Sequence, residues 1–276
     1  MKIAVYLRNH MLDEDPRLLQ LMAELGAKGF AVYRVDGRAD ISGGTDVILS
    51  IGGDGTFLSA AALAGDSGIP VLGVNLGRLG FLSENRPETV AEALAGRKYN
   101  IEDRALLHTS FSAPTGCRHI AGWPYALNEV TVHRSGAAML GVDVSIDGAE
   151  LPTYWADGLL VATSSGSTAY SLSVGGPIVL PDSEVLVIAP IASHNLNVRP
   201  LVVPSTAAIG IRLRSRDRNV LFTMDNRTVE VDAGTQFSVS LAQFPLKRVR
   251  LGESTFIDAL VSKLFWGEDI RNSTGQ

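Results

Sequence analysis

Hydrophobic and polar positions follow two different periods along this chain. Over the first hundred residues, apolar runs of strand length alternate with segments whose apolar residues recur at helical spacing. The pattern predicts strands at 3–7, 30–35, 47–51 and 70–74, and helices from Pro16 to just before Gly29, at 56–64 and at 87–95. Asp15 as N-cap and Pro16 as first helical residue give a start signal. Strands that are apolar throughout and alternate with helices are typical of a parallel sheet covered on both faces, so we expect an α/β domain over residues 1–100.

After about residue 103, the apolar positions alternate with polar ones instead. Such alternation runs over 142–147, 209–214, 228–231 and 237–241, and Asp147-Gly148 marks a tight hairpin turn. Many short strands of this kind predict an antiparallel, sandwich-like domain, which we expect over residues 101–250. The remaining segment, 251–276, contains apolar residues at helical spacing between Phe256 and Trp266 and predicts a closing helix.

Composition and charge exclude several classes of protein. The 276 residues carry 24 Lys and Arg against 29 Asp and Glu, a net charge of −5, which is unlike a dedicated nucleic-acid binder. Cys117 is alone, so it forms no internal disulfide, and with His119 it lacks the second pair that a zinc site needs. Because no apolar run approaches the ~20 residues of a membrane span, we expect a cytoplasmic protein that binds neither nucleic acid nor a membrane.

A glycine-rich segment, Gly52-Gly53-Asp54-Gly55-Thr56, follows the third predicted strand and opens the next helix. Glycines there allow a phosphate to approach backbone N–H groups at the positive end of a helix. A carboxylate in such a loop repels phosphate, unless it holds Mg²⁺ or takes a proton from an attacking hydroxyl. Either role indicates phosphoryl transfer, while the alternative is an ordinary turn in which Asp54 caps the helix. The P-loop motif and, after the first strand, the dinucleotide motif G-x-G-x-x-G are both absent.

Two further segments carry candidate binding groups. In residues 156–170, a short strand runs into hydroxyl side chains around Gly166, which suits ribose or phosphate recognition but also an ordinary Ser/Thr-rich turn. Asn128-Glu129 interrupts an apolar run and offers a donor and an acceptor for ribose hydroxyls, or is simply a solvated strand end. Tyr154 and Trp155 precede Asp157 and are candidates either for stacking on a ligand ring or for the core.

Taken together and in this order, these motifs closely resemble those of the bacterial NAD kinase family. The glycine–aspartate loop alone is also found in diacylglycerol and sphingosine kinases and in phosphofructokinases, but the combination is specific. Further segments that resemble the family are Gly73–Gly77, Leu79–Leu82 and Arg199–Val202. The resemblance covers nearly the whole chain.

The resemblance implies a fold, an activity and partners. Family members have an α/β N-terminal domain and a β-rich C-terminal domain, with residues 251–276 expected to pack back on the former. The implied reaction transfers the terminal phosphoryl group of ATP, or of polyphosphate, to the 2′-hydroxyl of the adenosine ribose of NAD. Asp54 matches the general base of that reaction. Mg²⁺ or another divalent metal is expected to be held mainly through the phosphates, and the chain to form a homodimer or homotetramer.

The resemblance also implies site residues. Asn128 and Glu129 match residues that hold a ribose, and Asp157 matches an acidic residue near the nicotinamide end, in some members contributed by a neighbouring subunit. The segment that lines the adenine and ribose pocket in family members is matched here by residues 168–170 and Ser173. The nucleotide-binding set implied in this way is Gly53, Asp54, Gly55, Asn75, Asn128, Glu129, Asp157, Ser165, Thr168, Ala169, Tyr170, Ser171, Leu172, Ser173 and Ala192.

Two departures from the family pattern and two alternative functions are open at this point. Ser164 stands where the family usually has proline. Because serine does not fix φ as proline does, we expect the turn to be a little looser. The region after Asp225-Asn226-Arg227 is less typical of the family. The alternatives are a lipid or sugar kinase with a similar loop, and a non-catalytic sensor that binds NAD or NADP.

Overall fold

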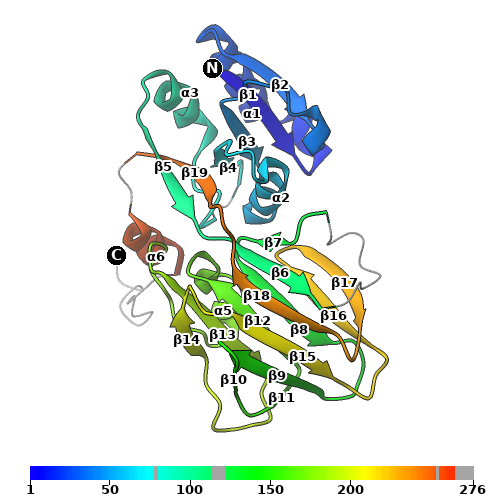
Figure 1. Cartoon of the computed structure of the whole chain (residues 1–276). Coiled ribbons are helices and arrows are strands. Elements are labelled where there is room, and N and C mark those ends of the chain that lie inside the picture. The colour runs from blue at the N-terminus through cyan, green and yellow to red at the C-terminus, as the bar shows by residue number, and fades with distance from the viewer. Residues whose placement is uncertain (78–79, 113–121, 253–254, 265–276) are drawn as a thin grey trace, which may run out of the picture. The chain divides into compact units, whose positions relative to one another are not determined.

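In a computed structural model of the chain, the described residues are 1–77, 80–112, 122–252 and 255–264 (Figure 1). Cys117, His119, Leu79 and Trp266 lie outside them. The chain divides into two compact units, one made of residues 1–102 with 247–276 and the other of residues 103–246.

The first unit is built on a mostly parallel sheet with strand order β2-β1-β3-β4-β19-β5 (Figure 1). β1 pairs in parallel with β2 and β3, and β4 pairs in parallel with β3 and β19. The strands are β1 (Lys2–Leu7), β2 (Ala31–Val35), β3 (Val47–Ile51), β4 (Val71–Val74), β5 (Tyr99–Arg104) and β19 (Leu246–Leu251). The helices are α1 (Pro16–Ala27), α2 (Asp54–Ala64), α3 (Pro87–Ala95) and α6 (Phe256–Leu264), with 3₁₀ turns at His10–Glu14 and Arg38–Asp40.

Helices cover both faces of this sheet. Side chains of α1 and α3 share one apolar cluster with alternate residues of the strands, including Leu72 and Val74. Gly73 lies between these two residues and therefore faces the other side of the sheet. A Cβ at Gly73 would lie 3.0 Å from the ring of Phe57, a fully buried residue of α2. The prediction of an α/β sheet with two covered faces is confirmed.

Local signals explain the helix ends in this unit. The Asp15 carboxylate accepts a hydrogen bond from the Arg17 N–H at the start of α1, and Gly29 follows the helix with φ +79°. The helix expected over 56–64 begins two residues earlier, at Asp54, with Gly53 as its N-cap. The carboxylate of Asp54 is therefore carried by the first helical residue.

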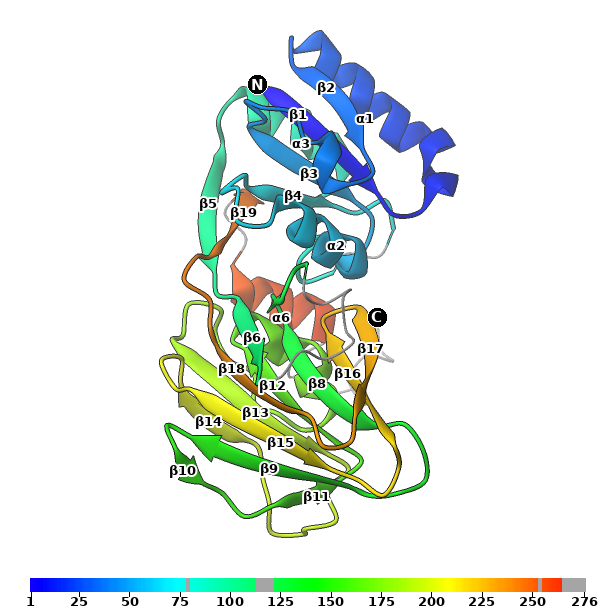
Figure 2. The same ribbon diagram turned by 45° about the vertical axis from the view of Figure 1, so that its right-hand side comes forward.

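The second unit consists of two antiparallel sheets, in which β9, β15, β18 and β6 run side by side in one sheet (Figure 1 and Figure 2). That sheet has the order β10-β9-β15-β18-β6-β7, with β11 paired to β9, and the other has the order β14-β13-β12-β8-β16-β17. The strands of the first are β6 (Leu107–Phe111), β7 (Tyr125–Ala126), β9 (Leu140–Ile146), β10 (Ala149–Glu150), β11 (Tyr154–Ala156), β15 (Ile209–Arg214) and β18 (Gln236–Leu241). The strands of the second are β8 (Glu129–Arg134), β12 (Gly158–Thr163), β13 (Val185–Ile191), β14 (Leu201–Pro204), β16 (Asn219–Met224) and β17 (Arg227–Asp232).

The two sheets of this unit enclose a common core. Alternate residues of both contribute to one apolar cluster, for example Val142 and Ile209 from the first sheet and Val161 and Phe222 from the second. The predicted hairpin turn joins β9 to β10, with φ +50° at Asp147 and +85° at Gly148. The expected antiparallel, sandwich-like fold is confirmed. In the described part of the chain, no helix has the length and hydropathy of a membrane span.

Candidate active site

The glycine loop joins β3 to α2 by an abrupt turn at the carboxyl end of the sheet. Gly52 has φ +144°, and its N–H donates to the Val74 carbonyl of β4 at 2.8 Å. A Cβ at Gly52 would lie 2.5 Å from the Thr56 hydroxyl oxygen, so this position requires glycine. Gly53 and Gly55 are exposed at the first turn of α2, where the helix dipole attracts anions.

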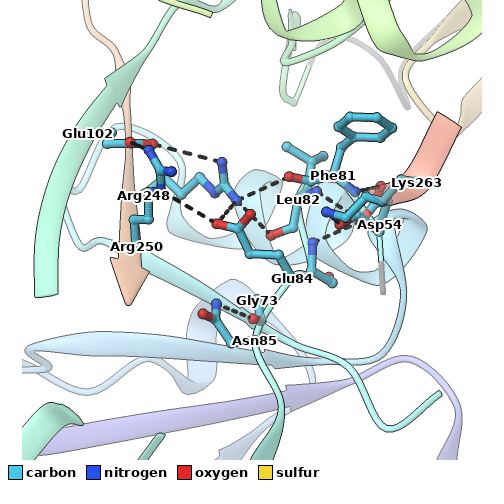
Figure 3. Close-up of polar contacts among 12 residues, drawn as sticks. Asp54, Gly73, Phe81, Leu82, Glu84, Asn85, Glu102, Arg248, Arg250 and Lys263 are labelled. Atoms are coloured by element: carbon cyan, nitrogen blue, oxygen red, sulfur yellow. Dashed lines mark hydrogen bonds and ion pairs between the residues drawn. The ribbon is translucent and has the colours of Figure 1, made fainter. Parts of the chain in front are cut away.

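Asp54 is held by a segment that comes later in the chain. Its Oδ2 accepts a hydrogen bond from the Phe81 N–H at 2.9 Å, and its Oδ1 accepts from the N–H groups of Leu82 at 3.1 Å and Ser83 at 2.8 Å (Figure 3). These three amides belong to the turn 80–83, which the Gly80 N–H closes by donating to the Ser83 carbonyl. The carboxylate is thus fixed by backbone groups rather than used to cap its own helix.

The turn lies so close to Asp54 that glycine is needed at its first residue. A Cβ at Gly80 would lie 2.0 Å from Asp54 Oδ1, well inside any real contact distance. A Cβ at Gly73 would lie 2.6 Å from the Leu82 carbonyl oxygen, which places the same turn directly against β4. Two glycines therefore allow the backbone of the turn to reach both the sheet and the carboxylate.

Asn75 follows β4, the strand beside the one that leads into the glycine loop. Its Oδ1 accepts from the Gly77 N–H at 2.8 Å, and its own N–H donates to the Asn85 carbonyl at 2.8 Å. The carboxyl ends of β3 and β4 thus bring the Asn75 segment and the glycine loop to one edge of the sheet, where α/β folds bind ligands.

In the second unit, Asn128 and Glu129 are buried side chains, exposed by only 7% and 8%. The Asp225 carboxylate accepts hydrogen bonds from three successive backbone N–H groups beside them: Leu127 at 2.8 Å, Asn128 at 2.7 Å and Glu129 at 3.3 Å. In return, the Asp225 N–H donates to the Glu129 carbonyl at 3.0 Å. The pair is therefore part of a fixed backbone segment and not a solvated strand end.

The hydroxyl-rich segment is joined to the same place. Thr163 donates its N–H to the Asn128 carbonyl at 2.9 Å and its hydroxyl to the Leu127 carbonyl at 2.6 Å. A Cβ at Gly166 would lie 2.1 Å from the Asn128 carbonyl oxygen, so the two segments touch backbone to backbone. The structure thus brings together two motifs that lie about 35 residues apart in the sequence.

Two carboxyl groups of this cluster are perturbed by burial, which raises the pKa of both Glu129 and Asp225. Burial, and next the Asp225 carboxylate, raise the pKa of Glu129 to about 8, although a hydrogen bond from the Tyr170 N–H opposes the shift. Its Oε2 is buried and has no hydrogen-bond partner within the described residues. A carboxyl group that is protonated at neutral pH can donate a hydrogen bond as well as accept one, which suits a sugar hydroxyl.

The remaining residues of this segment form two short helical turns, Ser165–Thr168 and Tyr170–Ser173. Ala169 links them, Leu172 is half-buried, and the Tyr170 ring is 39% exposed. The Ser171 hydroxyl is buried and has no partner within the described residues. Ser164 has φ −57°, close to the value that proline imposes, and its hydroxyl donates to the Pro181 carbonyl at 2.9 Å. The serine thus has a backbone angle that a proline at this position would also adopt.

Asp157 and Ala192 lie at the other end of the same sheet. β12 pairs with β8 so that Ala162 faces Glu129, and Asp157 precedes the opposite end of β12. At a strand rise of ~3.3 Å per residue, roughly 16 Å separate Asp157 from the Glu129 end. The Asp157 N–H donates to the Ile191 carbonyl at 3.0 Å, next to Ala192, whose φ is +46°.

A cavity of about 730 Å³ occurs at the Asp157 end and is lined in part by Arg134, Trp155, Asp157 and His194. The Arg134 Nε donates to the Asp157 carboxylate at 2.7 Å. Trp155 is 42% exposed and is available for stacking, whereas Tyr154 is buried in the core of the second unit. The structure therefore gives these two neighbouring aromatic residues different roles.

Sequence reasoning missed the groups that position these candidates. Neither the amides of 81–83 nor Asp225 belongs to the predicted site. The sequence signal for Asp225 is local: an Asp-Asn pair at 225–226 is typical of a tight turn. In the structure, Asp225 begins the turn between β16 and β17 and has φ +52°. Nothing in the spacing of residues 80–83 indicates which side chain their N–H groups bind.

The first unit carries a glycine loop at a helix N-terminus with a carboxylate fixed beside it, and the second unit carries buried polar groups. These features are typical of a nucleotide-dependent phosphotransferase. Two family models match the chain: the ATP-NAD kinase N-terminal domain over residues 10–98 and the ATP-NAD kinase C-terminal domain over residues 127–251. The chain belongs to the NAD kinase family.

Curated relatives and solved structures agree with this assignment. The NAD kinase of Flavobacterium psychrophilum is 36% identical, over 99% of this chain and 100% of that protein, and that of Bacteroides fragilis is 42% identical, over 82% and 78%. An NAD kinase from Archaeoglobus fulgidus, solved in complex with ATP, aligns with a TM-score of 0.73 and 26% identity over 90% of this chain and 93% of that one. Yeast NADH kinase complexed with NADH has the same fold, with a TM-score of 0.84 and 23% identity over 99% of this chain and 89% of that one.

Proposed function

We propose that this chain transfers the terminal phosphoryl group of ATP, or of polyphosphate, to the 2′-hydroxyl of the adenosine ribose of NAD, with Asp54 as the general base. The observation that carries the proposal is the Asp54 carboxylate, fixed by three amides at the N-terminus of α2 directly after the glycine loop. The related kinase from Archaeoglobus fulgidus, solved with ATP, supports ATP as the donor.

In the proposed step, Asp54 accepts the proton of the 2′-hydroxyl as the ribose oxygen forms a bond to the terminal phosphorus. The bond between that phosphorus and the bridging oxygen breaks, so that ADP leaves when ATP is the donor. A carboxylate has about four lone-pair positions on its two oxygens. The amides of 81–83 use three of them and fix the orientation of the carboxylate, which leaves one on Oδ2 for the hydroxyl proton.

For the acceptor, we assign the ribose contacts to Asn128 and Glu129 and the adenine pocket to Thr168, Ala169, Tyr170 and Ser173. The buried, partly unsatisfied carboxyl of Glu129 and the exposed Tyr170 ring support this assignment. Asp157 and Ala192 lie about a strand length away, so we assign them to the dinucleotide site of a neighbouring copy in a homodimer or homotetramer.

Mg²⁺ fits this site as a metal held mainly by phosphate oxygens. The described residues contain no group of three or more His, Cys, Asp or Glu side chains that could form a protein cage, and Mg²⁺ is commonly bound by one or two carboxylates, water and phosphates. When bound, it neutralises charge on the donor phosphates. The part of this chain is to offer the amides and helix dipole of the loop to the donor phosphates, while Asp54 Oδ2 accepts the hydroxyl proton.

The test is the variant Asp54→Asn, with NADP formation from NAD measured with ATP, then with polyphosphate, with and without Mg²⁺. Loss of a general base lowers kcat by about 10²–10⁴-fold, while NAD binding measured by calorimetry should persist. Asp66→Asn is the matched control, because Asp66 is an exposed carboxylate paired with Arg38 in the same unit. Near-normal turnover in Asp54→Asn would overturn the role of Asp54. A wild-type chain that binds NAD but forms no product would instead be the non-catalytic sensor.

A further inference from the structure

The turn that fixes Asp54 is itself held by two elements from the end of the chain. Arg248 on β19 is 5% exposed, and its Nη2 donates to the Phe81 carbonyl at 3.1 Å and to the Glu84 carboxylate at 2.7 Å. Arg250, also on β19, pairs with the Glu102 carboxylate at 2.9 Å (Figure 3). β19, which lies beside β4 in the sheet, therefore contacts the turn through Arg248.

The second element is α6, which contacts the turn through Lys263. The Lys263 ammonium donates a hydrogen bond to the Gly80 carbonyl and lies 5.0 Å from the centre of the Phe81 ring (Figure 3). Gly80 is the residue whose backbone lies directly against the Asp54 carboxylate. Lys263 thus binds the turn at the point closest to the proposed base.

The sequence of α6 explains why Lys263 faces the turn. Phe256, Leu260 and Lys263 are spaced four and three residues apart, so they share one face of the helix. The Phe256 ring lies 6.2 Å from the Phe81 ring, and Leu260 is buried. Phe256 and Leu260 pack this face of the helix against its neighbours, and this packing places the Lys263 ammonium beside the Gly80 carbonyl.

The Lys263 ammonium is partly buried among charged groups and is not a freely solvated surface charge. Burial lowers the pKa of Lys263, Arg248 lowers it further, and the carboxylates of Glu84 and Asp54 oppose both effects. A half-buried ammonium costs free energy unless it is bound. Here the Gly80 carbonyl, the Phe81 ring and the nearby carboxylates offset that cost.

We propose that Lys263 is a positioning residue for catalysis: its ammonium holds Gly80 so that the amides of 81–83 keep the Asp54 carboxylate in its reactive orientation. The C-terminal helix is then part of the catalytic apparatus. This inference rests on the proposed role of Asp54. It assigns to Lys263 no contact with substrate, and it places the effect on kcat rather than on the binding of either nucleotide.

The experiment compares Lys263→Met and Lys263→Arg with Lys28→Met, which removes a lysine paired with the exposed Glu92 carboxylate in the same unit. Because misplacing a catalytic group by ~1 Å costs up to about 10²-fold in rate, we expect Lys263→Met to lower kcat about tenfold or more. The KM values for ATP and NAD should change less than about threefold, since uniform binding is not affected. Lys263→Arg should recover most of kcat, and Lys28→Met should match the wild type.

A double-mutant cycle tests whether Lys263 acts through Asp54. In the Asp54→Asn background, Lys263→Met should lower kcat little further, because residues that act as a unit are not additive. An equal loss in both backgrounds, or a kcat within about twofold of wild type for Lys263→Met alone, would overturn the inference. If the methionine variant does not fold, as judged by thermal melting, Lys263→Gln serves the same comparisons. Full activity of Asp54→Asn would refute the proposed base, whereas an inactive Asp54→Asn beside a fully active Lys263→Met would refute only the role of Lys263.

Discussion

Replacing Gly80 by alanine tests the contact that most tightly defines the position of Asp54. The substitution adds one methyl group at a point where the backbone lies directly against the Asp54 carboxylate. That Cβ would lie 2.0 Å from Asp54 Oδ1, 2.4 Å from Cγ and 2.6 Å from Oδ2. The added methyl group and the Asp54 carboxylate must therefore move apart. The neighbours on the opposite side of the turn restrict how far the turn itself can move.

The size of the effect follows from these distances. The methyl group and the carboxylate must move from 2.0 Å to the 3.4 Å at which ordinary van der Waals contact begins, a displacement of more than 1 Å. The turn cannot retreat freely, because the Leu82 carbonyl already lies against Gly73 of β4. We therefore expect Asp54 to rotate away and lose one or more of its amide hydrogen bonds, each worth about 1.5–3 kcal/mol to a charged group. A shift of ~1 Å in a catalytic group predicts a loss of about 10²-fold in kcat.

The assay is steady-state formation of NADP from NAD and ATP, together with thermal melting of the same preparation. We expect Gly80→Ala to fold, to melt earlier and to lose kcat with little change in KM for ATP. Gly26→Ala is the matched control, because a Cβ at Gly26, in the last turn of α1, meets nothing within 4 Å and should leave kcat unchanged. A Gly80→Ala enzyme with kcat within about threefold of wild type would show that the fixed orientation of Asp54 is not needed for turnover.

Two further predictions concern the second unit. Burial raises the pKa of Glu129 from 4.5 to about 8, so the folded chain keeps a proton that the unfolded chain releases; the stability from this proton is complete below the unfolded value and is lost as pH rises through about 8. The melting temperature of Glu129→Gln minus that of the wild type should therefore rise steadily between about pH 5 and pH 8. A difference in melting temperature that does not change with pH would contradict the raised pKa of Glu129. Asp225→Asn replaces the carboxyl group that accepts hydrogen bonds from three successive amides, and an amide side chain has only one oxygen with which to accept them. We expect KM for NAD to rise about tenfold with KM for ATP nearly unchanged, measured by steady-state kinetics, and an unchanged KM for NAD would exclude this positioning role.

Local signals in the sequence were sufficient for the fold class. The apolar runs near 3–7 and 47–51 reflect a sheet that is covered on both faces, and the helical spacing after Pro16 reflects a helix that packs one side against it. The alternation over 142–147 reflects a sheet with one buried side. Asp147-Gly148 specifies its own hairpin, because both residues adopt positive φ. Such features depend on neighbours in the chain and can be predicted without tertiary structure.

The candidate site was predictable only as a set of segments. The glycine loop, Asn128-Glu129 and the hydroxyl segment are visible in the sequence because they contain unusual residue types at fixed spacing. Their partners are not visible, because every residue except proline carries a backbone N–H and nothing local marks those that bind a distant carboxylate. Asp225, 96 to 98 residues away from the amides it binds, is the clearest example.

By itself, the sequence determined that a glycine turn carrying Asp54 joins a buried strand to a helix, since strand, turn glycines and helix are all local properties. The structure then placed the start of the helix at Asp54, two residues before the expected start. Only the tertiary structure decided that its carboxylate binds the amides of 81–83, that Lys263 holds the first residue of that turn, and that Asp157 lies a strand length from Glu129. The physical reason is that these arrangements depend on close packing between segments far apart in the chain. Such packing is set by the shape of the whole unit and by glycines such as Gly80 that permit the approach.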